Sequence, residues 1–228
     1  MRLLKRKTLA QPRGFLIVHP PKKENPNSFL PSPPCKFLIV FLETIGNTPL
    51  VRMNKIGKPG IEADVFLKVE YFNPGNSIKD RIGLNMVIEA EEKRISTAGG
   101  TIIECTSGNT GMGLALAAAV KGYKCIFTTT DKQSKEKIDV LRAIGAEVIV
   151  CPTNVAHEDP RNYHMVARAT HKRNSKLSYF INQYENLDNR LAHYKTTGPK
   201  FGSKPKEKLP TLLPPLAPEE PFRAQQSI

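Results

Sequence analysis

The sequence has no apolar run long enough to cross a membrane. Its longest such run, residues 37–42, is far shorter than the roughly twenty apolar residues that a bilayer requires. It also has few cysteines, and none is paired at the CxxC spacing that is typical of zinc and redox sites. We therefore expect no membrane span and no metal site. The cysteines are expected to be free, buried thiols in a reducing compartment: Cys35, Cys105, Cys125 and Cys151.

Acidic residues are scarce at the beginning of the chain. Residues 1–40 contain eight Lys or Arg and one acid, Glu24, whereas residues 41–200 contain 22 basic and 17 acidic residues. A nucleic-acid-binding protein would concentrate basic residues on one folded element with interleaved aromatics, so we expect no nucleic-acid partner. The basic leader is similar to a mitochondrial targeting peptide, but its prolines at 12, 20 and 21 interrupt any amphipathic helix. We expect a cytoplasmic protein, with mitochondrial targeting as the alternative.

Proline is scarce only in the middle of the chain. Seven prolines lie in residues 1–40 and six in residues 201–228, with six over the long stretch between them. Proline-rich polar segments do not form a packed core. The sequence therefore predicts an irregular leader at 1–42, one folded domain at 43–199 and an irregular tail at 200–228.

Strand and helix patterns alternate within this domain. Such alternation predicts βαβ units and an α/β fold with a doubly wound, mostly parallel sheet. In the first helix, Ile82, Met86 and Ala90 share one face, and Gly145 is expected to cap the third helix. The expected strands are 64–70, 101–105, 123–129, 147–151 and 177–181, and the expected helices are 79–94, 109–121, 134–144 and one that begins at Asp159 or Asn162 and ends near 172.

Lys79 stands at the beginning of the first predicted helix, after a tight loop at 73–77. A lysine that forms a Schiff base needs a fixed, partly desolvated position, and the positive end of a helix disfavours the ammonium form. Ser77 is suited to cap the helix and to fix where it begins. A lone lysine early in a helix is usually only solvated. The hypothesis that Lys79 forms a Schiff base therefore depends on the loop at 73–77, which fixes where the helix begins.

A second motif, Thr106–Gly111, joins a predicted strand to the next helix. Gly108 allows the backbone to approach a ligand, and Asn109 can donate through its amide. A small-residue turn that opens a helix suits an anion, although it is also a common tight turn. Because ligands of open α/β sheets bind beyond the carboxyl ends of the strands, we expect Lys79 and Asn109 on that edge.

The combination of four motifs indicates a protein family more specifically than any one motif does. They occur in this order and at compatible spacing at residues 45–52, 77–81, 106–111 and 196–199. In these residues the chain resembles the pyridoxal-phosphate-dependent β-replacement enzymes of fold type II, cysteine synthase and cystathionine β-synthase. The resemblance covers residues 43–199 and implies a fold similar to that of the tryptophan synthase β subunit. Serine dehydratases and racemases are related, but their equivalent turn usually differs from Ser-Gly-Asn-Thr-Gly.

The resemblance also implies roles for individual residues. Lys79 would form a Schiff base with pyridoxal phosphate and take the substrate Cα proton, and Asn109 would hydrogen-bond the 3′ oxygen of the cofactor. The substrate α-carboxylate would be held by Thr106, Ser107, Thr110 and Gln183. The reaction would replace the β-substituent of serine, or of an O-activated serine, with a thiol or sulfide, with the cofactor as electron sink.

The sequence departs from this family after residue 199. The family continues into a glycine-rich loop that binds the cofactor phosphate, whereas in this chain only Gly198 and Gly202 follow Gly145. Each lost charge-assisted hydrogen bond weakens binding by about 1.5–3 kcal/mol, so we expect reduced cofactor affinity and an incomplete second domain. In addition, Cys105 stands where the family usually has proline or alanine.

Two functional hypotheses remain open from the sequence. One is an enzyme of sulfur amino-acid metabolism with an amino-acid substrate. The other is a non-catalytic paralogue that docks on a full-length relative, or a homo-oligomer of this chain. Some cystathionine β-synthases bind haem through an N-terminal Cys and His, but we interpret His19 and Cys35 as incidental and expect no haem.

Overall fold

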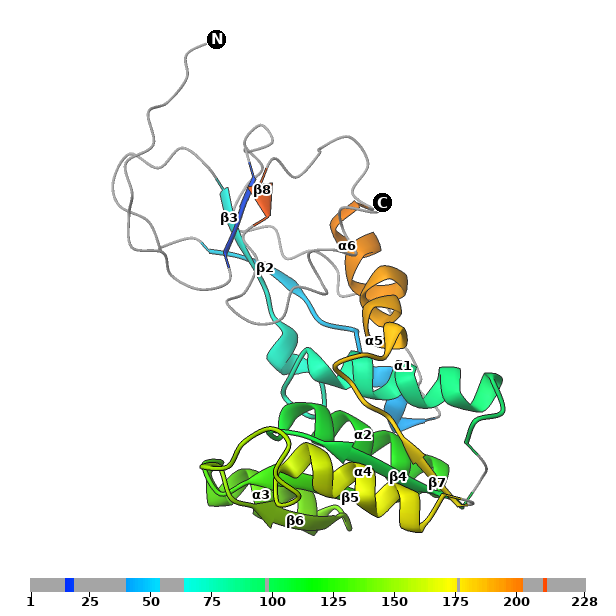
Figure 1. The fold of residues 1–228 in the computed structure, drawn as a ribbon. Coiled ribbons are helices and arrows are strands. Elements are labelled where there is room, and N and C mark those ends of the chain that lie inside the picture. The colour runs from blue at the N-terminus through cyan, green and yellow to red at the C-terminus, as the bar shows by residue number, and fades with distance from the viewer. Residues whose placement is uncertain are drawn as a thin grey trace.

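The computed structural model describes residues 15–18, 40–53, 64–96, 99–175, 177–202 and 211–212. These residues form two sheets, which Figure 1 shows at opposite ends of the molecule. The larger sheet is parallel and has the order β6-β5-β4-β7: β4 is Thr101–Cys105, β5 Lys124–Thr130, β6 Glu147–Cys151 and β7 Ser178–Phe180. The smaller sheet is antiparallel and has the order β2-β3-β1-β8: β1 is Phe15–Val18, β2 Leu50–Arg52, β3 Asp64–Lys68 and β8 Thr211–Leu212.

Helices cover both faces of the parallel sheet. The helices α2 (Asn109–Lys121) and α3 (Lys135–Ala143) lie on one face, with α1 (Lys79–Glu92) packed on α2, and α4 (Tyr163–Arg173) lies on the other. The chain then continues through α5 (Leu187–Ala192), a π-helical turn η3 (His193–Thr197) and α6 (Gly198–Gly202). Two short 3₁₀ helices, η1 (Phe41–Thr44) and η2 (Glu70–Phe72), precede α1. No helix in the described ranges is long and apolar enough to cross a bilayer.

The expected α/β class with a parallel sheet is confirmed, and the predicted helices and strands agree closely with those observed. The bounds of β4, α2 and β6 match the sequence prediction. The third helix has Ile144 and not the predicted Gly145 as its C-cap, and Gly145 follows directly with a φ of +101°. Of the two expected starts of the last predicted helix, Asn162 is the cap, since its side chain accepts a hydrogen bond from the His164 N–H at 3.0 Å.

One strand differs from the prediction. We expected residues 64–70 in the parallel sheet, but β3 pairs antiparallel with β2 and β1 in the smaller sheet. An apolar run shows that a strand exists but not which partner it has, and β2 is only three residues long. Moreover, β1 and β8 lie within the leader and tail that were expected to be irregular.

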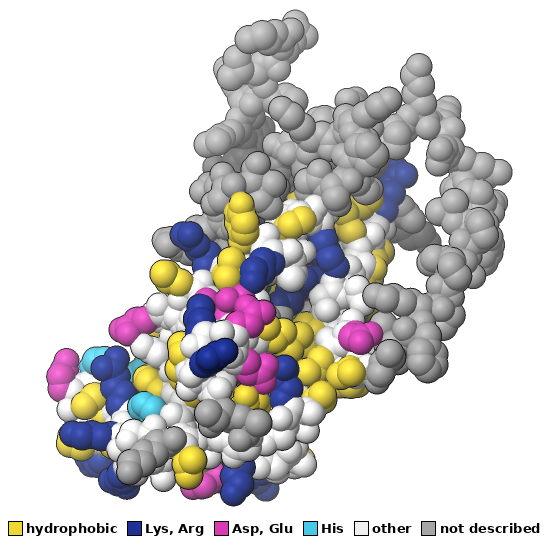
Figure 2. Space-filling model, turned by 90° about the vertical axis from the view of Figure 1, so that its right-hand side faces the viewer, with side chains coloured by type: hydrophobic (Ala, Val, Ile, Leu, Met, Phe, Trp, Pro, Cys, Tyr) yellow, Lys and Arg dark blue, Asp and Glu magenta, His cyan; other side chains and the backbone are white. Residues whose placement is uncertain are grey.

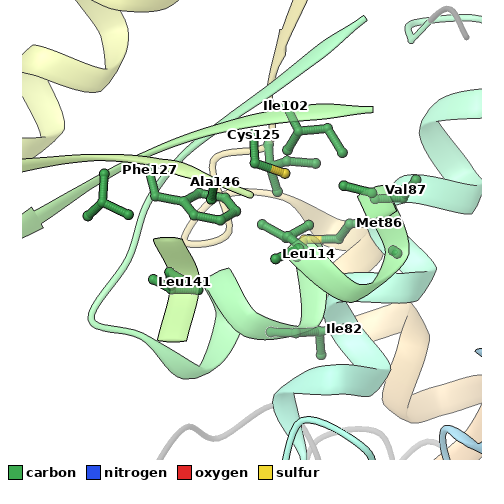
Figure 3. Close-up of a cluster of buried hydrophobic side chains, with 14 of the residues drawn as sticks. Ile82, Met86, Val87, Ile102, Leu114, Cys125, Phe127, Leu141 and Ala146 are labelled. Atoms are coloured by element: carbon green, nitrogen blue, oxygen red, sulfur yellow. The ribbon is translucent and has the colours of Figure 1, made fainter. Parts of the chain in front are cut away.

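The main hydrophobic core lies between the parallel sheet and the helices α1, α2 and α3 (Figure 3). The predicted face of α1 is confirmed, because Ile82, Met86 and Ala90 are all buried there. Successive side chains of a strand point to opposite faces, so Ile102 joins this core while Ile103 faces α4. Both faces of the sheet are therefore buried, as in other doubly wound folds.

Two glycines allow α1 and α2 to cross at close range. A Cβ on Gly83 would lie 2.5 Å from the carbonyl carbon of Gly113, and one on Gly113 would lie 2.7 Å from the carbonyl oxygen of Lys79. Any larger residue would force the helices apart. This contact places the backbone of Lys79 against α2, one turn after Asn109.

Candidate active site

The predicted site residues come from the carboxyl edge of the parallel sheet and from the first turns of α1 and α2. Thr106 follows β4 directly, and Gln183 follows β7. Because β4 and β7 are hydrogen-bonded neighbours, the segments that follow them lie side by side. Residues far apart in the sequence are thus brought together by the strand order.

Thr106 organises the turn that opens α2. Its Oγ1 accepts hydrogen bonds from the backbone N–H groups of Gly108 and Gly111, both at 3.1 Å. Gly108 has a φ of +129°, a conformation that L side chains rarely adopt. Thr106 is buried, whereas Ser107 and Asn109 are exposed on the outside of the turn. Their side chains are therefore accessible to a ligand, while the Thr106 hydroxyl is already an acceptor within the turn.

Thr110 and Gln183 form the closest contact between the two segments. The Thr110 hydroxyl donates to Gln183 Oε1 at 2.6 Å, and Gln183 Nε2 donates to the carbonyl oxygen of Cys105 at 3.0 Å. Both side chains are buried. The structure thus brings Thr106, Thr110 and Gln183 together.

Lys79 is the first residue of α1, and its side chain is half-buried. Ile78, and not the predicted Ser77, is the N-cap of α1, but the Lys79 backbone N–H donates to Ser77 Oγ at 3.1 Å just before the helix. The loop before it is fixed by Asn73, whose Oδ1 accepts from the Gly46 N–H at 2.7 Å and whose Nδ2 donates to the carbonyl oxygen of Ser77 at 2.9 Å. The position of Lys79 is therefore set by the loop, by the helix start and by the α1–α2 crossing.

An ion-pair network joins the motif at residues 45–52 to the motif at residues 77–81, and the sequence did not reveal it. Arg81 Nε lies 2.7 Å from Glu70 Oε2, and Lys68 Nζ lies 3.0 Å from Glu70 Oε1. The Thr48 hydroxyl donates to Glu70 Oε1 at 2.6 Å. Burial alone would raise the pKa of Glu70, but the hydrogen bonds and charge of Arg81, with Thr48 and Lys68, lower it to about 2. Arg81 lies on α1 two residues after Lys79, so this network helps to fix the first turn of that helix.

Glu104 is a buried carboxyl group directly behind the site, and sequence reasoning missed it. Its Oε2 accepts from the Gln183 N–H at 3.1 Å, and its Oε1 accepts from the Cys105 N–H at 3.0 Å. Burial raises the pKa of Glu104 to about 7, although these hydrogen bonds act in the opposite direction. Its place in a strand of apolar residues was the available signal, since a carboxyl group there must find internal donors.

The described cysteines are free and buried, as expected for Cys105, Cys125 and Cys151. Cys35 and His19 lie outside the described residues. Burial raises the pKa of the Cys105 thiol, whose Sγ lies 3.0 Å from His164 Nδ1. Within the described ranges, no group of three or more His, Cys, Asp or Glu side chains is arranged to hold a metal ion.

The arrangement suits a carbonyl cofactor and an amino-acid carboxylate. Lys79 supplies an amine at a fixed, half-buried position, and the Thr106–Gly111 turn with Gln183 supplies hydroxyl and amide groups beside it. These residues fit the aldehyde end of pyridoxal phosphate and the carboxylate of its substrate. For the phosphate, no glycine-rich loop occurs in the described residues after Gly145, where only Gly198 and Gly202 are present.

Comparison with known proteins agrees with this assignment. Residues 41–208 match the family described as pyridoxal-phosphate dependent enzymes. The chain is 48% identical to cystathionine β-synthase of Oryctolagus cuniculus over 179 residues, which is 78% of this chain and 32% of that protein. It is 45% identical to cysteine synthase 1 of Neurospora crassa over 157 residues, which is 69% of this chain and 41% of that protein.

A solved structure gives the same result. The O-acetylserine-dependent cystathionine β-synthase of Helicobacter pylori matches with a TM-score of 0.64 and 33% identity, covering 73% of this chain and 54% of that one. The chain thus spans about a third of the length of the cystathionine β-synthases that it matches and about half of this structure. From the family match and these relatives, the chain belongs to the pyridoxal-phosphate-dependent enzymes, in the branch of the cystathionine β-synthases and cysteine synthases.

Proposed function

We propose that this chain supplies the lysine side and the carboxylate side of a β-replacement site, which acts on serine or an O-activated serine with a thiol or sulfide. The contact between Thr110 and Gln183, beside the helix that begins with Lys79, carries this proposal. The O-activated substrate is suggested by two similar proteins, the O-acetylserine-dependent cystathionine β-synthase and an O-ureido-L-serine synthase. The pathway would be cysteine biosynthesis and sulfur amino-acid metabolism.

Each residue has a defined task in this proposal. Lys79 would hold the cofactor at its aldehyde end, and its amine would be the base that takes the proton from the substrate Cα. The exposed Asn109 amide orients the cofactor through its 3′ oxygen, and the substrate carboxylate is held by Thr106, Ser107, Thr110 and Gln183. Pyridoxal phosphate, when bound, supplies the electron sink that makes loss of the Cα proton and of the β-substituent feasible.

A second candidate function is docking on a full-length relative. One observation favours it: large aromatic side chains are exposed beside the smaller sheet, with Phe41 53%, Tyr71 58% and Phe72 62% exposed. Hydrophobic side chains also gather on the face that Figure 2 shows. Exposed apolar patches often mark interaction sites, so these aromatics offer a partner an apolar surface close to Glu70 and the network behind Lys79.

The test is product formation from O-acetylserine or serine with sulfide or homocysteine, in the presence of pyridoxal phosphate. In one arm the chain acts alone, and in the other it is mixed with a full-length cystathionine β-synthase whose own cofactor lysine has been replaced. Activity in the first arm supports a complete site. Activity in the second arm alone supports docking, because the lysine must then come from this chain.

Thr110→Val tests the carboxylate side in whichever arm is active. Losing one hydrogen bond to a charged group weakens binding by about 1.5–3 kcal/mol, so we expect activity to fall at least about tenfold at low substrate concentration. Thr170→Val is the matched control, because the Thr170 hydroxyl donates to the carbonyl oxygen of Val166 within α4 on the opposite face of the sheet. Equal activities of the two variants would exclude Thr110 from the site.

A further inference from the structure

The smaller sheet is built from two different parts of the chain. β2 and β3 lie within residues 41–208, which match the pyridoxal-phosphate family, whereas β1 and β8 lie outside that range. β1 lies between β3 and β8, and Figure 1 draws it in dark blue. An isolated two-stranded sheet is only marginally stable in water. The strands from outside the family range therefore extend a sheet that β2 and β3 alone would leave marginal.

The backbone of β3 divides its hydrogen bonds between its two neighbours. The N–H of Met53, directly after β2, donates to the carbonyl oxygen of Val65 at 2.8 Å, so Val65 faces the β2 side. In antiparallel strands, successive residues direct their N–H and C=O groups to opposite sides. Leu67 therefore also faces β2, whereas Phe66 faces β1, where it lies opposite Leu16. The leader thus covers the second edge of β3.

The two outer strands of the smaller sheet are short and follow prolines. An uncovered strand edge attracts other strands, and proteins protect such edges with short strands and with proline. β8, at one edge, has two residues and follows Pro210 directly. β2, at the other edge, has three residues and follows Pro49 directly. The longer strands β1 and β3 are thereby placed inside the sheet, where each has a neighbour on both sides.

β3 leads directly into the network that fixes the first turn of α1. Its last residue, Lys68, donates to the carbonyl oxygen of Thr48 at 2.7 Å, and Lys68 Nζ lies 3.0 Å from Glu70 Oε1. Glu70 in turn pairs with Arg81 on α1. A strand that covers β3 therefore also stabilises the segment that carries this network.

We propose that β1 is a capping strand: the chain's own leader occupies, intramolecularly, the edge of β3 to which a strand of another protein would otherwise add. Strand addition to a sheet edge is a common mode of protein association, in which main-chain hydrogen bonds supply the affinity. A partner that adds a strand to β3 has to displace β1 first. The leader is thus a built-in competitor for this edge, and the inference does not depend on the proposed reaction.

The test is amide hydrogen exchange of the full 228-residue chain, followed residue by residue by NMR. Leu16→Pro removes the N–H that faces β3, and proline is excluded from the interior of a sheet. We expect the Phe66 amide to exchange about tenfold faster in this variant, the factor that corresponds to one hydrogen bond. The Leu67 amide still pairs with β2 and should be less affected. Unchanged exchange at Ile103 in β4 shows that the parallel sheet is intact.

Leu30→Pro is the matched control, because it places the same residue in the leader outside β1. A second measurement needs no variant: in the wild-type chain the Leu16 and Phe66 amides should both be protected, to the same degree at low and at high protein concentration. Unchanged Phe66 exchange in folded Leu16→Pro would overturn the proposal. So would an unprotected Leu16 amide in the wild-type chain, or protection that rises with concentration, since the cap would then come from a second copy.

Discussion

Arg81→Ala is expected to reduce the free energy of unfolding by about 3–5 kcal/mol at neutral pH. Removing one partner of a buried ion pair leaves the other charge uncompensated, and a loss of this size is typical. Arg81 is 3% exposed and makes hydrogen bonds to Glu70, Thr48 and the Gly46 carbonyl oxygen. Lys68 remains beside Glu70 in the variant, so the lower end of this range is expected. Urea denaturation followed by circular dichroism measures the change.

Arg161→Ala is the matched control for this prediction. Arg161 also pairs with a carboxylate, Asp159, at 2.7 Å, but its side chain is 70% exposed. Exposed ion pairs contribute about 0–1 kcal/mol, so the control should be close to wild type. The stabilisation from Glu70 should be fully present above about pH 4.5 and should diminish as the pH falls toward its folded pKa of about 2. Equal losses in the two variants would show that the network does not support α1.

Glu104→Gln is expected to gain stability relative to wild type as the pH rises. Burial raises the pKa of Glu104 from 4.5 to about 7, so the folded chain holds a proton that the unfolded chain has lost. Stability from this group is therefore present below about pH 4.5 and is lost as the pH rises through about 7. The shift corresponds to about 3–4 kcal/mol between these limits. The variant removes this dependence.

The comparison with wild type at each pH isolates Glu104 from other titrating groups. Burial also raises the pKa of Asp80, to about 6, whereas the lowered pKa of His193 acts in the opposite sense. These contributions are common to both proteins and cancel in the difference. Glu147→Gln, at an exposed position on β6, is the control variant. A flat difference for Glu104→Gln would mean that this carboxyl group has an ordinary pKa.

Much of the fold could be predicted because the parallel sheet follows strong local patterns. The bounds of β4, α2 and β6 follow from apolar runs bounded by glycine and polar residues. The small antiparallel sheet could not be predicted, because β3 pairs with strands that lie far from it in sequence or are only three or four residues long. Pairing between short, distant segments depends on tertiary packing, which a local pattern does not contain.

In the candidate site, too, some residues could be predicted from the sequence and others could not. The family resemblance assigned Thr110 and Gln183 to one substrate carboxylate, and in the structure their side chains are 2.6 Å apart. Their roles toward cofactor and substrate stay predictions. The supporting groups could not be predicted, since Glu104 and His193 acquire their character from burial and from the charges around them. For Glu104 the one local sign is its place in a strand of apolar residues, which does not show the donors that it meets, and His193 has no such sign.

The most direct test of this account is to locate the lysine that pyridoxal phosphate modifies. The purified chain is incubated with the cofactor, dialysed, reduced with borohydride and mapped by mass spectrometry, and its visible absorbance is recorded before reduction. We predict one dominant adduct, at Lys79, and its loss in Lys79→Ala. An adduct at another lysine, or retained cofactor in Lys79→Ala, would contradict the assignment. No retained cofactor in wild type would contradict a functional half-site in this chain.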